Sequence, residues 1–243
     1  MTRFDHEYHL HTVFLLCVIM PTVSGNICCS YPQFEADTYS DEAYVFIDSG
    51  RLGTTYSYYN VTAHMVYDFT KNRTYANVTS VEVSPQLPQP LVSRYQLIND
   101  YNNKTQYMFH GNACLKYSIG AFEPLCVPDT AILLSTSYIG NNKTYLDTYL
   151  VTHLPDPTEY RESIDRKSCL PVFMTFTLDS SVPDSGTMTS LVMSNVQPGI
   201  SNPAVFNPPQ YCNTSPKEKP HQISRSIRQL LARHPLFASF MHI

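Results

Sequence analysis

The 243-residue chain is poor in charge and contains no tryptophan. Charged side chains make up 15% of it, against roughly 25% in an average soluble protein. This low charge, together with many Tyr and Thr residues, argues against a coiled coil and against intrinsic disorder. The formal net charge of -4 argues against a general nucleic-acid binder, which needs a basic surface to contact phosphates. The composition therefore favours a folded, β-rich protein.

The chain also lacks a long apolar run. Residues 13–20 form an apolar stretch of eight, whereas a transmembrane helix needs about 20. Pro21 and the small or apolar residues up to Gly25 follow it, as in a secretory signal peptide. We therefore expect residues 1–25 to be a signal peptide and the protein to be secreted, with lysosomal delivery as another end of the same route. No later stretch predicts a transmembrane segment.

Sequons for N-glycosylation are numerous. A single Asn-x-Ser/Thr triplet is weak support, but six of them behind a signal peptide indicate a glycoprotein. The modified asparagines must lie on the surface. The six are Asn60, Asn72, Asn77, Asn103, Asn142 and Asn213.

The cysteines agree with an oxidising compartment. Of the seven, Cys17 lies in the expected signal peptide, and an even number remains, which predicts three disulfides. No Cys-x-x-Cys or Cys/His pair has zinc spacing. The neighbours Cys28 and Cys29 are expected to reach separate partners. The remaining cysteines are Cys28, Cys29, Cys114, Cys126, Cys169 and Cys212.

Apolar and polar residues alternate with a period of two through most of the chain. Residues 54–69, for example, are rich in Tyr, Thr and Val and almost free of helix-forming residues. Turn sequences such as Asp48-Ser-Gly50 separate runs of this kind. Short strands with polar turns predict an all-β fold, with antiparallel sheets packed as a sandwich or a partly open barrel.

A shift in charge divides the chain. Residues 26–216 hold 10 Lys and Arg against 17 Asp and Glu, whereas residues 217–243 hold five basic residues and one acid. We expect one domain over 26–216 and a basic C-terminal extension over 217–243. In the extension, Ile227, Leu230 and Leu231 fall on one side of a short amphipathic helix. Such a helix would dock on a membrane or a partner, and a loosely ordered extension is the alternative.

Catalytic signatures are absent from the sequence. There is no Gly-x-Ser-x-Gly, His-Glu-x-x-His, P-loop or dinucleotide-binding glycine motif. His64, His110 and His153 each lie in a strand-like run, where a structural imidazole is the commoner outcome, and a triad is defined by geometry that a sequence does not give. We expect no catalytic residue and no enzymatic activity.

Two acidic clusters raise the question of calcium, which prefers hard oxygen ligands. Neither cluster has the spacing of an EF-hand loop, and a solvated acidic loop explains both. Calcium is the one cofactor that we consider, with its ligands unknown. The clusters are Asp37, Asp41 and Glu42, and Asp156, Glu159, Glu162 and Asp165.

Aromatic and methionine residues in the later part of the chain suit either an ordinary core or a lipid-sized cavity between sheets. Methionine adapts to irregular apolar ligands. The candidate pocket residues are Phe109, Phe122, Met174, Phe176, Met188, Leu191 and Met193.

Several segments resemble the ependymins and ependymin-related proteins. Four short runs carry the resemblance: Cys114-Leu-Lys-Tyr, Phe122-Glu-Pro-Leu-Cys-Val-Pro128, Ser137-Tyr-Ile-Gly140 and Lys167-Ser-Cys169-Leu-Pro171-Val. The longest match is Gly199-Ile-Ser-Asn-Pro-Ala-Val-Phe-Asn-Pro-Pro-Gln-Tyr-Cys212. It is similar to the family signature Gly-Ile-x-Asp/Asn-Pro-x-Val-Phe-x-Pro-Pro-x-x-Cys.

The resemblance implies two antiparallel sheets that curve around a deep hydrophobic pocket as a half-barrel, like bacterial lipoprotein-carrier folds. It implies a lipid or another apolar ligand, homodimers, and no catalysis. It also implies calcium binding, partly through glycans, and cell–matrix contact.

The resemblance further implies particular disulfides. The family pattern pairs Cys114 with Cys212, and Cys169 with either Cys28 or Cys29. The chain departs from that pattern because it lacks the family's middle cysteine before Cys114. It has Cys126 instead, which we therefore assign to the remaining member of Cys28 and Cys29.

The leading hypothesis is a secreted, ependymin-like glycoprotein that binds a lipid or another hydrophobic ligand in a pocket between sheets, with calcium as a further ligand. The alternative is an extracellular-matrix or cell–matrix adhesion glycoprotein that acts through its surface, its glycans and calcium. A cavity lined by Met, Phe, Leu and Tyr would favour the first hypothesis. A filled core with an acidic patch would favour the second.

Overall fold

The computed structural model describes residues 26–48, 53–85, 87–122, 124–141, 143–152, 159–179, 185–215 and 217–218. The expected signal peptide and the expected C-terminal helix both lie outside these residues.

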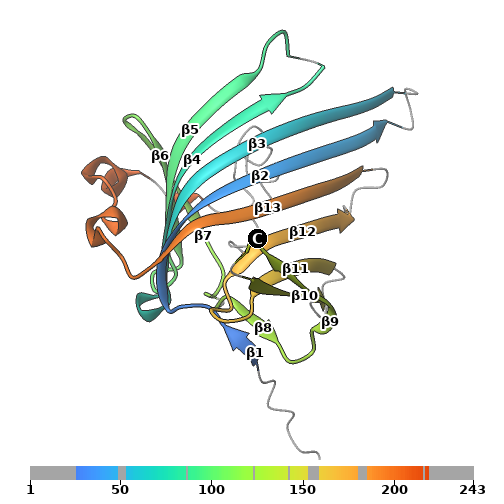
Figure 1. Cartoon of the computed structure of the whole chain (residues 1–243). Coiled ribbons are helices and arrows are strands. Elements are labelled where there is room, and N and C mark those ends of the chain that lie inside the picture. The colour runs from blue at the N-terminus through green and yellow to red at the C-terminus, as the bar shows by residue number, and fades with distance from the viewer. Residues whose placement is uncertain are drawn as a thin grey trace, which may run out of the picture.

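A curved sheet of twelve strands makes up most of the protein (Figure 1). Neighbouring strands pair antiparallel except for the first two, which are parallel. In sheet order the strands are β14 (Lys217–Glu218), β7 (Ala113–Ser118), β6 (Thr105–His110), β5 (Leu91–Asp100), β4 (Arg73–Val83), β3 (Gly53–Asp68), β2 (Gln33–Asp48), β13 (Ser185–Pro198), β12 (Pro171–Asp179), β11 (Glu159–Asp165), β10 (Thr144–Thr152) and β9 (Ile132–Ile139).

A second sheet has two antiparallel strands, β1 (Asn26–Cys29) and β8 (Cys126–Pro128). Val127 of β8 is buried against Tyr149 and Val151 of β10. The small sheet therefore packs on the large sheet at β10. This apolar contact stabilises the β10 end of the large sheet.

The long central strands show why the chain adopts this fold. Along β3, Tyr59, Val61 and Ala63 are buried, whereas the intervening Thr62 and His64 are exposed. Successive side chains of a strand point to opposite faces of the sheet. The alternation in the sequence thus gives β3 a concave face that excludes water and a convex face that is largely polar.

Three short 3₁₀ helices complete the described fold: η1 (Phe69–Lys71), η2 (Pro203–Phe206) and η3 (Gln210–Thr214). The last two lie on the convex side of the sheet. There the guanidinium of Arg73 sits 4.0 Å from the ring centroid of Phe206 in η2. Arg73 also donates to the buried carboxylate of Asp68, with 2.9 Å between Nε and Oδ2.

The carboxylate of Asp68 accepts several hydrogen bonds at this convex-face contact. In addition to the bond from Arg73, it accepts hydrogen bonds from Gln33 Nε2 at 2.8 Å and from Thr70 Oγ1 at 2.6 Å. Burial alone would raise the pKa of Asp68, but these bonds, together with Arg73, outweigh burial and hold the pKa below its usual value. The ionised form therefore ties β3, η1 and β4 together.

Three disulfides connect parts of the chain that are far apart in sequence. They join Cys28 to Cys169, Cys29 to Cys126 and Cys114 to Cys212. The adjacent Cys28 and Cys29 reach separate partners, and the pairs agree with the family pattern and with the assignment of Cys126. The second disulfide links β1 to β8 in the small sheet, and the third links β7 to η3.

The predicted fold class is confirmed: the protein is all-β, with two antiparallel sheets of unequal size, and the large sheet curves as an open half-barrel rather than a closed one. Among the described residues, no helix has the length and apolarity that a membrane crossing requires.

We predict that replacing both Cys114 and Cys212 by Ser lowers the free energy of unfolding by about 2–5 kcal/mol. The disulfide closes a loop with a sequence separation of 98 residues, and its removal frees that loop in the unfolded chain. Urea unfolding of the purified protein measures the change. The exposed substitution Thr152→Ser is the control, and a double variant as stable as that control would contradict the prediction.

Candidate functional site

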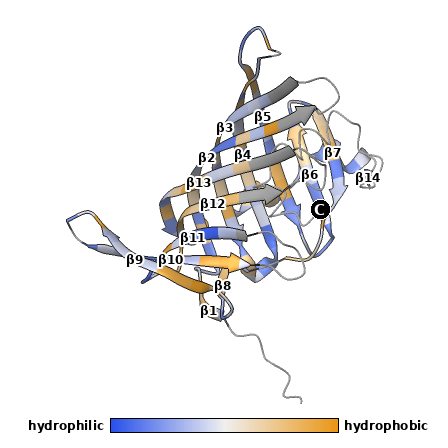
Figure 2. Ribbon diagram, turned by 90° about the vertical axis from the view of Figure 1, so that its right-hand side faces the viewer, coloured by the Kyte–Doolittle hydropathy of each residue, from blue (hydrophilic) through white to orange (hydrophobic). Residues whose placement is uncertain are grey.

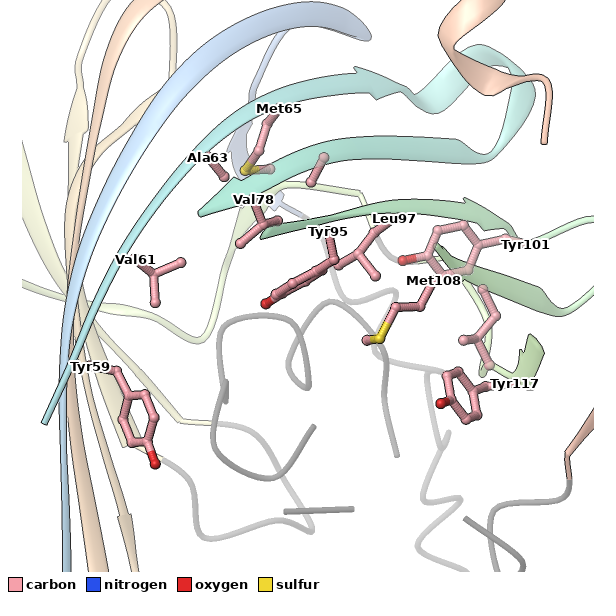
Figure 3. Packing of buried hydrophobic residues seen from close by; sticks show 12 residues of the cluster. Tyr59, Val61, Ala63, Met65, Val78, Tyr95, Leu97, Tyr101, Met108 and Tyr117 are labelled. Carbon is pink, nitrogen blue, oxygen red and sulfur yellow. The ribbon is translucent and has the colours of Figure 1, made fainter. Parts of the chain in front are cut away.

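The candidate site is the concave face of the large sheet, which carries several buried apolar clusters. Side chains from β3 to β6 point to the same side there (Figure 3). Cross-strand registration places Ala63, Val78 and Tyr95 opposite one another in adjacent strands. The buried members of this cluster are Tyr59, Val61, Ala63, Met65, Ala76, Val78, Tyr95, Leu97, Tyr101, Met108, Tyr117 and Ile119.

Further apolar clusters lie on the other half of the sheet, beside the buried polar side chains Ser40 and Glu42 of β2. Met174, Phe176 and Leu191 form one buried cluster there, with Tyr160 of β11 against it. Phe34 and Met193 belong to a neighbouring cluster together with Tyr67 and Leu170. The concave face therefore offers apolar contacts on both halves of the half-barrel.

Phe122 lies at one end of this surface, in the segment that follows β7. Its ring centroid is 5.4 Å from that of Tyr67, 4.7 Å from that of Tyr101 and 5.6 Å from that of Phe69. The hydroxyl of Tyr67 accepts a hydrogen bond from the backbone N–H of Leu125 at 3.1 Å. Burial raises the pKa of Tyr67 to about 12. The ring contacts of Phe122 place an aromatic cluster at this end of the face.

Five of the seven predicted pocket residues come together on or beside this face: Met174, Phe176, Leu191, Met193 and Phe122. The other two, Phe109 and Met188, do not, and their inclusion is corrected here. Phe109 lies on the convex side, packed with Ile98 and Cys212, and Met188 is exposed at 58%.

The reason for both corrections is the two-residue period of a strand. Leu191 and Met193 are two apart in β13, so they share a face, whereas Met188 is an odd number of residues from each and falls on the other face. Phe109 pairs with Gln96 and Cys114 across the sheet, and Leu97 and Met108 form the next, concave pair. The parity of the strand could have shown from the sequence that Met188 lies on the face opposite to Leu191 and Met193.

Sequence reasoning also missed most of the apolar site, which is contributed by β3, β4 and β5. Val61, Val78 and Leu97 belong to it, and each lies in a run of alternating residues that predicted a strand. The sequence does not indicate which side of such a strand is concave, because burial on either face produces the same alternation.

Acidic side chains are also buried on the concave face. Glu42 of β2 is 1% exposed and Glu162 of β11 is 6% exposed. Burial raises the pKa of Glu162 to about 7. Burial, and then the nearby charge of Glu42, also raise the pKa of Tyr95. The apolar surface is therefore interrupted by groups whose ionisation is costly in such surroundings.

The two acidic clusters that suggested calcium are not brought together. Asp37 and Asp41 lie on the convex face, where Asp37 binds His64 and Asn195 and Asp41 accepts from Tyr39, Tyr58 and Asn60. Glu42 and Glu162 face the concave side, and Asp165 accepts from Ser168 in the turn after β11. Asp156 and the side chain of Glu159 lie outside the described residues. Within the described ranges no three His, Cys, Asp or Glu side chains form a metal-binding group.

The two described histidines, His64 and His110, are exposed. His64 Nδ1 is 2.9 Å from Asp37 Oδ1, and its Nε2 is 3.9 Å from Glu35 Oε2. Hydrogen bonds from Asn195 and then His64 lower the pKa of Asp37 despite some burial. His110 is exposed at the end of β6, and His153 lies outside the described residues.

The described sequons avoid the concave face. Asn77, Asn103 and Asn213 are exposed, whereas Asn60 and Asn72 are half-buried. Asn60 and Asn77 lie at convex positions of β3 and β4, and the others lie in turns or in η3. Asn142 lies outside the described residues. None of these five sequon positions lies among the apolar residues of the concave face.

Comparison with known proteins gives one clear sequence family. The profile of the Ependymin family matches residues 91–212. The curated protein named Ependymin-related protein 1, from Haliotis asinina, is 28% identical over 206 residues, which span 80% of this chain and 94% of that protein.

Solved structures are similar only at low scores. An uncharacterized conserved protein from Thermus thermophilus matches with a TM-score of 0.41 and 6% identity over 75% of this chain and 90% of its own. A LolA superfamily protein from Nitrosomonas europaea matches with a TM-score of 0.21 and 10% identity over 73% of this chain and 91% of its own. These scores are too low to support a statement about this chain.

We predict that Glu162→Gln raises the free energy of unfolding by roughly 3 kcal/mol at pH 8 and changes it little at pH 5. The folded pKa of about 7 lies above the ordinary value of 4.5. The stabilising contribution of the neutral acid is therefore complete below pH 4.5 and is lost as the pH rises through 7. Glutamine, which cannot ionise, does not suffer that loss.

Denaturant unfolding at the two pH values measures this effect. Ser163→Ala, at the adjacent convex position, is the control and should change stability equally at both. Equal effects of Glu162→Gln at pH 5 and pH 8 would show that the carboxyl group does not titrate in the predicted range.

Proposed function

Because the chain belongs to the ependymin family, we propose that it is a secreted glycoprotein that binds a lipid or another apolar ligand against the concave face of its large sheet. The observation that carries this proposal is the segregation of side chains between the two faces. Val61, Val78 and Leu97 lie on the concave side, and the described sequons lie elsewhere.

The apolar face suits a hydrophobic ligand because transfer of apolar surface out of water is favourable by roughly 25 cal/mol per Å². The large sheet curves around this apolar side as an open half-barrel. Methionines at Met65, Met108 and Met174 add side chains that adapt to irregular apolar shapes. These features support a ligand recognised mainly by its hydrocarbon surface.

Secretion is supported by the covalent chemistry of the domain. Three disulfides are characteristic of proteins that fold in an oxidising compartment. Exposed sequons at Asn77, Asn103 and Asn213 are accessible to glycans. Together with the predicted signal peptide over residues 1–25, they support passage through the secretory route.

A homodimer is supported by the outermost strand, β9. The β9–β10 hairpin projects from the edge of the sheet (Figure 2), and all eight residues of β9 are exposed. Large apolar side chains at an unpaired sheet edge favour pairing with a second strand. The exposed residues are Ile132, Leu133, Leu134, Tyr138 and Ile139.

The second candidate function is a surface-acting adhesion glycoprotein. One observation favours it: the convex face carries the exposed pair Tyr39 and Tyr58, which both donate to Asp41 at 2.8 Å. Such an ordered polar surface, flanked by the sequon at Asn60, is suited to an extracellular partner. The calcium ligands of this function stay unassigned, and among the residues that the structure describes no three His, Cys, Asp or Glu side chains form a metal-binding group.

We predict that the protein, purified from a eukaryotic secretory host, carries a stoichiometric apolar ligand that organic solvent extracts and mass spectrometry identifies. Ala63→Leu, which adds apolar bulk to the concave face, should lower the extracted amount at least severalfold because the larger side chain occupies volume that the ligand would fill. Ala43→Leu, at a convex position of β2, should leave it unchanged.

A folded, oxidised protein that carries no ligand and takes up none in solution would contradict the carrier function. It would leave the surface-acting glycoprotein as the better description. Equal ligand loading in the two alanine variants would instead move the binding site away from the concave face.

We predict that Leu133→Asp shifts the protein from dimer to monomer, because a charge in the centre of an apolar sheet edge opposes pairing. Light scattering coupled to size-exclusion chromatography measures the mass. Thr152→Ser, at an exposed end of β10, is the control. A wild-type protein that is monomeric at micromolar concentration would contradict the homodimer.

A further inference from the structure

The convex face of the large sheet carries a group of exposed apolar side chains on β2, β3, β12 and β13. They lie in two neighbouring cross-strand rows. In the first row Tyr39 pairs with Val192, which pairs with Phe173. In the second row Tyr58 of β3 and Met188 of β13 lie on the two sides of β2. These five side chains, here called the convex patch, are between 40% and 58% exposed, and adjacent exposed apolar side chains mark a surface that something covers.

Asn60 lies within the convex patch, between its two rows. In β3 it is two residues from Tyr58 and two from Thr62, so all three point to one face, and Thr62 pairs with Tyr39. Nδ2 of Asn60 donates to the hydroxyl of Tyr39 at 3.0 Å and also to Oδ1 of Asp41. The hydroxyls of Tyr39 and Tyr58 both donate to that same oxygen at 2.8 Å. The amide nitrogen of Asn60 and the two phenol groups therefore meet at one carboxylate oxygen.

The amide of Asn60 can carry a sugar and still contribute to this network. Asn60-Val61-Thr62 is a glycosylation sequon, and Thr62 is exposed on the convex face. N-glycosylation replaces one of the two hydrogens on Nδ2, so the other remains to donate to Asp41. Asp41 also keeps both tyrosine donors. A glycan would therefore leave the carboxylate hydrogen-bonded and would begin inside the convex patch.

We propose, resting on the glycoprotein function above, that the N-linked glycan of Asn60 packs on the convex patch, with its first sugar rings over the exposed rings of Tyr39 and Tyr58. A pyranose ring has C–H groups on its faces and hydroxyl groups around its rim. The faces suit the negatively polarised face of a tyrosine ring, and their contact removes apolar surface from water. The hydroxyl groups at the rim stay in contact with water.

The place of attachment favours the chain's own glycan over a separate partner as what covers the convex patch. A protein that docked on Tyr39 or Tyr58 would have to displace a group bonded to Asn60 between them. The packed glycan would thus be a fixed part of the outer surface, and it would remove the surface on which the second candidate function depends.

Asn77 offers a matched comparison, because it carries a sequon on the same face of the adjacent strand β4. Its cross-strand neighbours are the polar residues His64 and Gln96. The tyrosine two residues before it, Tyr75, packs against the cluster that contains Ile98. A glycan on Asn77 is therefore expected to extend into water.

Site-resolved mass spectrometry of the full-length chain, secreted by a eukaryotic host, tests the proposal. We expect Asn60 and Asn77 both to carry glycans. When an N-glycosidase acts on the folded protein, release from Asn60 should be about tenfold slower than release from Asn77, because the packed sugars must first leave the surface. After unfolding the two rates should be equal.

Two substitutions of Tyr58 separate the packing of its ring from its hydrogen bond to Asp41. Tyr58→Thr removes the ring and should raise the rate of release from Asn60 severalfold. Tyr58→Phe keeps the ring, loses the hydroxyl group and should leave the slow release unchanged. Release from Asn77 is the internal control and should be the same in both variants.

Loss of the packed glycan should also lower stability. Thr62→Val destroys the sequon of Asn60 but leaves Asn60 in place, and Thr79→Val makes the same change at the residue of β4 that pairs with Thr62 and destroys the sequon of Asn77. We expect Thr62→Val to lower the melting temperature by about 2–4 °C more than Thr79→Val. Equal melting temperatures would overturn the packing of the Asn60 glycan.

The remaining outcomes separate this inference from the function on which it rests. An unmodified Asn60 beside a modified Asn77, or equal release from the two sites of the folded protein, would overturn the inference and leave a secreted glycoprotein in place. The convex patch would then be open to an extracellular partner. Absence of glycans from every sequon would overturn both the inference and the glycoprotein function.

Discussion

The two-residue alternation of side chains along the long central strands is the constraint on which the rest of this structure depends. In β2, Asp41 accepts hydrogen bonds on the convex face, while its neighbour Glu42 is 1% exposed on the concave face. A one-residue slip in register would exchange these environments and place the apolar set in water. Fold, polar outer surface and candidate site thus follow from the same pairing of β2 with β3.

Contacts with segments outside the strands stabilise the large sheet. On the convex side, Asp68 binds Arg73, which in turn covers the ring of Phe206. This connects the segment that carries the longest family motif to the middle of the sheet. The Cys114–Cys212 disulfide ties the end of that segment to β7. The concave face, in contrast, is formed by strand side chains and by the aromatic side chains that contact Phe122.

Much of this could be predicted from the sequence because it depends on local patterns. Strand alternation predicted an all-β fold, and an even number of cysteines predicted three disulfides, all of which the structure contains. The site was predicted only in part. Met188 was misplaced although its parity relative to Leu191 excludes it. The burial of Glu162 could not be predicted, because its neighbours Tyr149 and Met174 are brought beside it only by strand pairing.

The central claim is that the concave face binds an apolar ligand, and a crystal structure of the protein as secreted by a eukaryotic host tests it most directly. The account predicts continuous electron density for an elongated, largely apolar molecule in contact with Val61, Leu97 and Met174. A folded, oxidised protein with no electron density for any non-protein molecule on the concave face would contradict it.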